Sequence, residues 1–189
     1  DRFTTLAILR NMLIKFGLKS HHDYVFMIDS DTLPEKELLF NLINSLELNQ
    51  CDVIAPMPFI EDFKNYNNDY FYDTLAFIDN ENVKFKHISP YNKQLINKDI
   101  IKMNSVGTCY LTKSNVFNLN DFEKYNIIKC YNESINKSLI SYEGTENNNP
   151  ISEQISFFNK IKKKGYQVYV DKNIKLLHIN LEKLQLKWH

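Results

Sequence analysis

Two aspartates spaced two residues apart are the first side chains in this sequence whose arrangement could support chemistry. Asp29 and Asp31 directly follow an apolar run over 24–28. If that run is a buried strand, both carboxylates lie where open α/β sheets bind ligands, outside the carboxyl ends of the strands. Carboxylates this close repel each other, and a divalent cation would relieve the repulsion. Because oxygen ligands suit Mg²⁺ or Mn²⁺ ions that bridge to phosphates, the pair predicts a metal–phosphate site.

The same pair also has structural explanations. A helix cap followed by a solvated turn would account for Asp29 and Asp31, and short motifs of this kind discriminate poorly. A calcium loop does not fit, because it needs a third oxygen ligand and a glycine at fixed spacing, where this sequence has Leu33 and Pro34. The choice between a capped turn and a metal site depends on the elements around the pair.

The elements that must position this pair alternate between helices and strands. Apolar residues at helical spacing predict helices over 1–19 and 35–48, and Thr32 with Glu35 could form a capping box for the second. Runs rich in β-forming residues predict strands over 24–28 and 52–56. This alternation predicts an α/β sandwich.

The rest of the chain is predicted to add further strands and one more helix. The elements are, in order, a loop over 59–72, strands over 74–78 and 103–112, a loop over 142–150, a helix over 151–164, and strands over 166–170 and 174–179. Gly107 interrupts the second of these strands, and Gly165 ends the helix. The last strand carries His178. The loop over 142–150 is a candidate mobile lid.

Composition limits the classes of partner. The 189 residues fit one domain over 1–189, and 43% of them are hydrophobic, enough for a core. Lys+Arg and Asp+Glu both number 23, so the balanced charge argues against nucleic acid as a partner. We expect no membrane segment in this chain, and its location stays open with the cytoplasm as the default. Three widely spaced cysteines fit neither a zinc site nor a disulfide framework.

Several segments resemble glycosyltransferases of the GT-A fold, and they come in the family's order. Residues 24–34 (YVFMIDSDTLP) resemble the Asp-x-Asp segment, and residues 6–11 (LAILRN) resemble the Ala-Arg-Asn helix ahead of it. Residues 152–157 (SEQISF) and 165–171 (GYQVYVD) resemble the acidic-motif helix and the Gly-Tyr turn. His178 matches the metal-ligating histidine near the end, so the resemblance covers about residues 2–179. Residues 72–76 (YDTLA) are also similar to fungal and capsule mannosyltransferase branches.

The resemblance implies both a fold and an activity. The fold is a GT-A sandwich with a mixed, mainly parallel central sheet, without the family's first strand and nucleotide-binding loop ahead of the Arg-Asn helix. The activity is transfer of a sugar from a UDP- or GDP-linked donor to a hydroxyl of a glycan or a protein. The cofactor is Mn²⁺ or Mg²⁺.

The resemblance also implies roles near the strand ends. Asp31 and His178 would ligate the metal, which neutralises the leaving diphosphate. Asp29 would assist the metal or hold the donor ribose. Ser30 and Asp73 would contact the substrates. A histidine in an otherwise apolar strand is also consistent with an ordinary core residue.

Other substrate contacts are implied further along the chain. Arg10 would be a forked donor to phosphate or sugar hydroxyls, with Asn11 as its polar neighbour. Gly107 and Gln154 would line the substrate site. Glu153 would be the catalytic base or hold the acceptor, although its place in the first turn of a helix is explanation enough for its charge.

One position departs from the family pattern. Many inverting members have a second acid in the acidic motif, where this chain has Gln154, an amide that cannot accept a proton. Either Glu153 serves as the base or the reaction uses none. Two other functions therefore stay open: a nucleotidyltransferase of similar fold, which four glycines argue against, and a non-catalytic carbohydrate-binding or assembly module.

Overall fold

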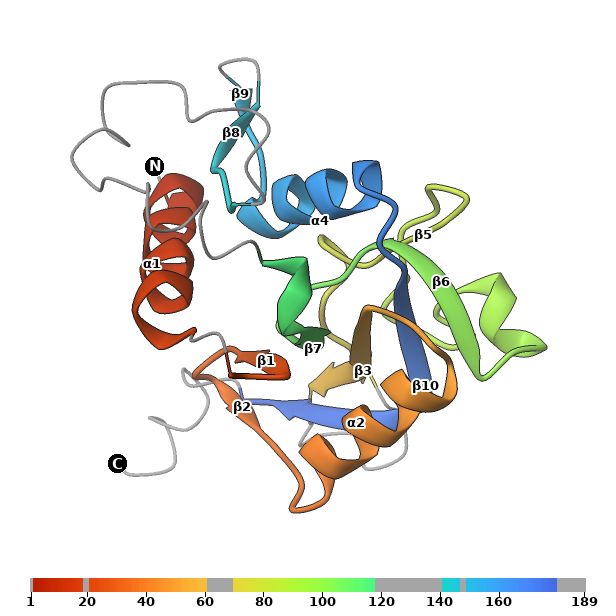
Figure 1. The fold of residues 1–189 in the computed structure, drawn as a ribbon. Coiled ribbons are helices and arrows are strands. Elements are labelled where there is room, and N and C mark those ends of the chain that lie inside the picture. Colours follow the sequence, from red (N-terminus) through yellow and green to blue (C-terminus); the bar gives the residue numbers. More distant parts are fainter. Residues whose placement is uncertain (1, 19–20, 61–69, 118–140, 147–148, 180–189) are drawn as a thin grey trace, which may run out of the picture. The chain divides into compact units, whose positions relative to one another are not determined.

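A computed structural model describes residues 2–18, 21–60, 70–117, 141–146 and 149–179 of the chain (Figure 1). The chain divides into two compact units. The first unit is Asp1–Val25 with Thr112–Tyr166, and the second is Phe26–Leu111 with Gln167–His189. Strands β1 (Tyr24–Ile28) and β7 (Cys109–Lys113) each begin in one unit and end in the other.

Two helices that pack against each other form the centre of the first unit, α1 (Arg2–Gly17) and α4 (Glu153–Lys163). The buried face of α1 repeats at positions three and four apart, as expected for a helix with one side in a core: Ala7, Arg10, Asn11 and Ile14. The predicted loop over 142–150 contains the short pair β8 (Thr145–Glu146) and β9 (Asn149–Pro150). The short helix η2 (Ser114–Val116) also belongs to this unit.

Gly144 is required by the close approach of two backbones in the first unit. A Cβ atom at this position would clash with the backbone of Phe3 and Thr4 in the first turn of α1. Two residues earlier in the chain, the Tyr142 ring stacks on Phe157 of α4, with ring centroids 4.4 Å apart. The segment before β8 therefore lies tightly against both helices.

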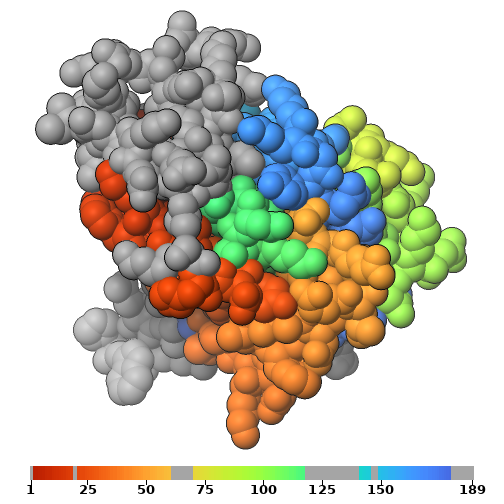
Figure 2. Space-filling view, viewed as in Figure 1, coloured from red at the N-terminus to blue at the C-terminus, as the bar shows by residue number. Residues whose placement is uncertain are grey.

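An eight-stranded sheet dominates the second unit, in the order β1-β7-β3-β10-β6-β5, with β2 added on β10 and β4 on β3. Besides β1 and β7, the sheet contains β2 (Thr32–Leu33), β3 (Val53–Ile60), β4 (Tyr70–Phe71), β5 (Ile78–Asp79), β6 (Ile100–Ser105) and β10 (Val168–His178). Helix α2 (Leu38–Leu48) packs on β3 and β10, and the short helix η1 (Lys93–Ile96) packs on β6. Helix α2 lies at the surface in the view of Figure 2, with Phe40 62% exposed.

The sheet is mixed and mostly antiparallel, which confirms the α/β class but differs from the mainly parallel sheet that we expected. Strands β3 and β10 pair in parallel. The pairs β10–β2, β10–β6, β3–β4 and β5–β6 are antiparallel. The added strands β2, β4 and β5 are only two residues long. A mainly parallel sheet is built from strands joined by helical crossovers, and these two-residue strands are not part of such units.

Several predicted boundaries move for identifiable reasons. Helix α2 begins at Leu38 rather than at residue 35, because Thr32 belongs to β2 and donates its Oγ1 hydrogen to the Asp29 carbonyl instead of capping the helix. Strand β3 continues past the predicted end at residue 56, and the carbonyl of Pro58 accepts a hydrogen bond from the Tyr72 N–H. The predicted strand over 74–78 is mostly a turn, which Asp73 stabilises by accepting the Ala76 N–H at 3.0 Å.

The two strands predicted over 166–170 and 174–179 form the single strand β10, whose register with β3 shifts between Val170 and Lys175. Asp171 lies buried in this irregular stretch. Its carboxylate accepts hydrogen bonds from the Ser45 hydroxyl at 2.7 Å and from the Asn173 N–H at 2.9 Å. Hydrogen bonds to the Asp171 carboxylate therefore stabilise the chain where the register shifts.

Among the helices that the structure describes, none is both long enough and apolar enough to cross a membrane.

Candidate functional site

The turn that follows β1 is fixed from two sides in the second unit. The Asp29 N–H donates to the Thr108 carbonyl at 2.9 Å, and the Ile179 N–H donates to the Asp31 carbonyl at 2.7 Å. Directly after the turn, β2 pairs with the end of β10, where Thr32 lies opposite His178. The turn is thus held between the segment ahead of β7 and the end of the central strand.

This pairing brings together Asp31 and His178, the two residues that the resemblance implied as metal ligands. Asp31 Oδ2 lies 3.2 Å from His178 Nε2 although the residues are 147 positions apart. The His178 side chain is 9% exposed and that of Asp31 is 36% exposed. The Tyr72 ring stacks on the imidazole, with centroids 3.5 Å apart and planes 22° apart. The imidazole is therefore held in one orientation.

Each member of this pair keeps one buried polar atom that has no hydrogen-bond partner among the described residues. The atoms are Asp31 Oδ1 and His178 Nδ1. A buried polar atom left unpaired costs about 1–3 kcal/mol. A ligand that contacted Asp31 Oδ1 could recover part of that cost, whereas His178 Nδ1 lies on the side of the ring away from Nε2, the atom that faces Asp31.

The donor types at this point fit a divalent cation. Carboxylate oxygen and imidazole nitrogen both bind Mn²⁺, and Mg²⁺ and Mn²⁺ complete their coordination with waters and substrate phosphates. Within the described residues, His, Cys, Asp and Glu do not form a cluster of three or more that could hold a metal. Asp31 and His178 would thus supply the protein ligands, and Asp29 does not join them in such a cluster.

Besides burial, the negative charge of Asp29 contributes to raising the pKa of two neighbouring side chains, Asp73 and Cys109. Burial raises the pKa of Asp73, and the negative charge of Asp29 adds to this, against the hydrogen bonds from Ala76 and Thr108. Burial, and then the charge of Asp29, also raise the pKa of the Cys109 thiol far above its ordinary value. The raised pKa favours the protonated thiol of Cys109. Ser30 is exposed between the two aspartates.

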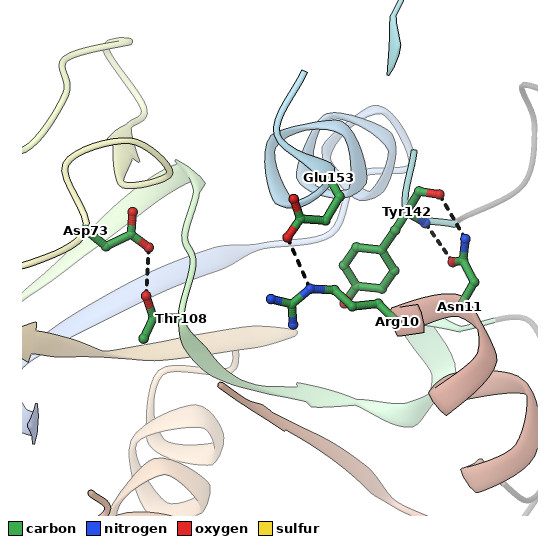
Figure 3. A network of polar contacts seen from close by, with 6 residues as sticks. All are labelled: Arg10, Asn11, Asp73, Thr108, Tyr142 and Glu153. Atoms are coloured by element: carbon green, nitrogen blue, oxygen red, sulfur yellow. Dashed lines mark hydrogen bonds and ion pairs between the residues drawn. The ribbon is translucent and has the colours of Figure 1, made fainter. Parts of the chain in front are cut away.

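Thr108 is a site residue that sequence reasoning missed. Its hydroxyl donates to Asp73 Oδ2 at 2.9 Å (Figure 3). Its backbone has φ 55°, which is unusual for a β-branched residue. The Cys109 N–H donates to the Gly107 carbonyl at 2.5 Å, an i to i+2 bond that closes a tight turn around Thr108. The sequence pointed to Gly107 as the special position, and its neighbour is the strained one.

Arg10 and Glu153 are paired within the first unit. Arg10 Nε lies 3.2 Å from Glu153 Oε1, with side chains 11% and 5% exposed (Figure 3). The guanidinium carbon also lies 5.9 Å from the centroid of the Tyr142 ring. The ion pair joins α1 to the first turn of α4, so both side chains have a structural role. The sequence did not predict that they would be partners.

Asn11 has a structural role in the same unit. It is fully buried, its Nδ2 donates to the Tyr142 carbonyl, and its Oδ1 accepts the Tyr142 N–H, both at 2.9 Å (Figure 3). The side chain thus pairs with the backbone of Tyr142 as a neighbouring strand would. Asn11 therefore attaches α1 to the segment before β8. Gln154 is buried at 7% exposure beside Glu153 in α4.

No family model matches this sequence, and no curated protein matches it significantly. The resemblance to glycosyltransferases of the GT-A fold therefore stays a prediction.

Proposed function

We propose that this protein is a metal-dependent glycosyltransferase that moves a sugar from a nucleotide-diphosphate donor to a hydroxyl acceptor. The observation that carries the proposal is the Asp31–His178 pair beyond the end of β1, with one unpaired buried atom on each residue. A carboxylate and an imidazole placed together at strand ends are suited to a divalent cation and the diphosphate that it binds.

The residues of the second unit have distinct roles in this proposal. Asp31 and His178 would hold the cation, and the Tyr72 ring keeps the imidazole in place. The bound Mn²⁺ or Mg²⁺ would supply positive charge to the departing diphosphate. Asp29 and Asp73 face the donor sugar or its ribose as hydrogen-bond acceptors. Thr108 fixes the Asp29 backbone and the Asp73 carboxylate at once.

Isothermal titration of UDP and GDP, with and without Mn²⁺, tests the metal–diphosphate half of the proposal. We expect saturable nucleotide binding only when Mn²⁺ is present. Asp31→Asn and His178→Gln should each weaken it at least tenfold, because each removes one protein ligand. Asp23→Asn and His21→Gln are matched controls, since both residues are exposed. Metal-independent binding, or equal binding by the site and control variants, would overturn the proposal.

A panel of UDP- and GDP-sugars, assayed for metal-dependent hydrolysis and transfer, tests the enzymatic half. Release of nucleoside diphosphate supports a glycosyltransferase, whereas release of pyrophosphate from a nucleoside triphosphate would identify a nucleotidyltransferase instead. Binding without turnover of any donor would favour a non-catalytic module.

Glu153→Gln tests the predicted base separately, because Gln keeps the shape and can still accept a hydrogen bond from Arg10. Loss of turnover with nucleotide binding retained would support Glu153 as the base. Unchanged turnover would remove it from that role.

A further inference from the structure

The short strand β4 of the second unit has one side chain in the core and the other at the surface. Phe71 is fully buried and packs on Phe59, with ring centroids 6.1 Å apart. Because side chains alternate between the two faces of a strand, Tyr70 lies on the opposite face. Tyr70 is 38% exposed, so part of its aromatic surface is accessible to a ligand.

His87 holds the Tyr70 ring in a fixed orientation. The two rings stack, with centroids 4.6 Å apart and planes 12° apart. The imidazole is itself attached to β4, because His87 Nδ1 lies 2.8 Å from the Phe71 carbonyl oxygen and the Phe71 N–H donates to the His87 carbonyl at 2.9 Å. One face of the Tyr70 ring lies on the imidazole, so a ligand would contact the other face or the edge.

The contact with the Phe71 carbonyl also determines which nitrogen of His87 carries the proton. A carbonyl oxygen only accepts hydrogen bonds, so Nδ1 is the donor and, in the neutral imidazole, Nε2 is an acceptor. His87 is exposed. An aromatic surface and a hydrogen-bond acceptor for a hydroxyl group therefore lie side by side at this point of the sheet.

Tyr70 belongs to the same row of the sheet as His178. Ile60 of β3 is opposite Tyr70 on one side and opposite His178 on the other. Registered neighbours share a face, so Tyr70 and His178 lie on one face, at the carboxyl ends of the parallel strands β3 and β10. Two strand spacings separate their Cα atoms by about 10 Å. The Tyr70 ring is therefore within reach of a substrate bound at the proposed diphosphate site.

We infer that Tyr70 is a stacking platform for a pyranose, whose C–H face lies on the ring and whose hydroxyl donates to His87 Nε2. The face of an aromatic ring is negative and attracts the polarised C–H bonds of a sugar. A single well-placed acceptor beside an apolar surface then fixes the orientation of the ligand. The assignment of this pyranose to the donor or the acceptor rests on the proposed function, whereas the binding of a pyranose can be measured without metal or nucleotide.

Saturation-transfer NMR with the methyl glycosides of glucose, galactose, mannose and N-acetylglucosamine tests the inference. We expect at least one of them to bind saturably to the wild-type protein. Tyr70→Ala should weaken this binding by about fivefold or more, because the contact with the ring is lost. Tyr70→Phe keeps the ring and should retain the binding. Phe40→Ala is the matched control, since Phe40 is an exposed aromatic residue of α2.

Two further variants test the platform if Tyr70→Ala is poorly folded. Tyr70→Val keeps a residue that favours strands but has no ring, and it should lose the same affinity as Tyr70→Ala. His87→Ala removes both the supporting ring and the acceptor, so it should also weaken glycoside binding.

Nucleotide sugars distinguish the two sources of the pyranose. If the ring holds the donor sugar, Tyr70→Ala should weaken the Mn²⁺-dependent binding of UDP-glucose or GDP-mannose and leave that of UDP and GDP unchanged. If it holds the acceptor, only glycoside binding should fall. Asp31→Asn should leave glycoside binding unchanged, so failure of the metal site is distinguishable from failure of the platform.

Three results would overturn the inference. The first is that none of the four glycosides binds saturably. The second is that the wild type, Tyr70→Ala and Tyr70→Val bind them equally. The third is binding of uridine or guanosine that depends on Tyr70 while no glycoside binds, because the ring would then hold a base.

Discussion

Thr108 connects three features of the second unit through a single residue. Its carbonyl accepts the Asp29 N–H, its hydroxyl donates to Asp73, and its own backbone lies in the left-handed region. A β-branched residue in that region costs about 1–3 kcal/mol. The rest of the unit must stabilise this conformation, so the strain and the position of the aspartates belong together.

The strain at Thr108 can be measured with a pair of variants. Thr108→Gly and Thr108→Ala both remove the hydroxyl, but only glycine adopts a positive φ without cost. We expect both to be less stable than the wild type, with the glycine variant more stable than the alanine variant by about 1 kcal/mol. Urea unfolding gives both free energies. Equal stability of the two variants would contradict a strained backbone.

The raised pKa of Asp73 predicts a pH dependence of stability. Because the folded protein holds this proton more tightly than the unfolded chain does, the contribution to stability is fully present below the ordinary pKa of 3.8. It is lost as the pH rises through the raised pKa of the folded state. Asp73→Asn should remove this contribution, so the unfolding free energy of the variant should fall less with rising pH than that of the wild type. Asp23→Asn, at an exposed position, should leave the slope as it is in the wild type.

At the scale of elements, the segment before β8 joins the two helices of the first unit. Asn11 of α1 pairs with the Tyr142 backbone, the Tyr142 ring stacks on Phe157 of α4, and Gly144 lies against the first turn of α1. Arg10 and Glu153 add an ion pair between the same helices. The Ala-Arg-Asn resemblance in α1 therefore coincides with residues that hold the unit together.

Gly144→Ala tests this packing. The added methyl group would clash with the backbone at Phe3 and Thr4, so we expect a loss of about 1–3 kcal/mol in unfolding free energy. Gly17→Ala is the matched control, because a Cβ at Gly17 would meet no atom within 4 Å. Thermal unfolding of both variants should show a lower midpoint for Gly144→Ala alone. Equal midpoints would mean that α1 shifts freely to make room.

At the scale of the whole molecule, periodicity predicted the long elements and missed the short ones. Helices α1 and α4 and strand β1 lie close to their predicted bounds, whereas β10 was predicted as two strands because its middle residues interrupt the apolar pattern. Strands β2, β4 and β5 are two residues long and carry no pattern, so the mostly antiparallel character of the sheet could not be predicted. The pair of Asp31 and His178 followed from a family resemblance, whereas the position of Thr108 depends on a backbone angle that residue types do not specify.

Metal binding should also be visible in the stability of the folded protein as a whole. A ligand that binds only the folded state adds about 2.7 kcal/mol when its concentration is a hundred times the Kd. Mn²⁺ should therefore raise the unfolding midpoint of the wild-type protein, and Asp31→Asn should abolish the shift. Asp23→Asn should retain it. A shift of the same size in all three proteins would indicate binding elsewhere.

Both units consist of two separate stretches of the chain, and this has a consequence for how the protein is made. Strand β10, which pairs with β2, β3 and β6, is synthesised only after residue 167. The strands of the second unit that precede β10 therefore leave the ribosome without their central partner, with a gap in the sheet that β10 fills later. Such non-local pairing slows folding, so β3 stays exposed to aggregation until β10 has been synthesised.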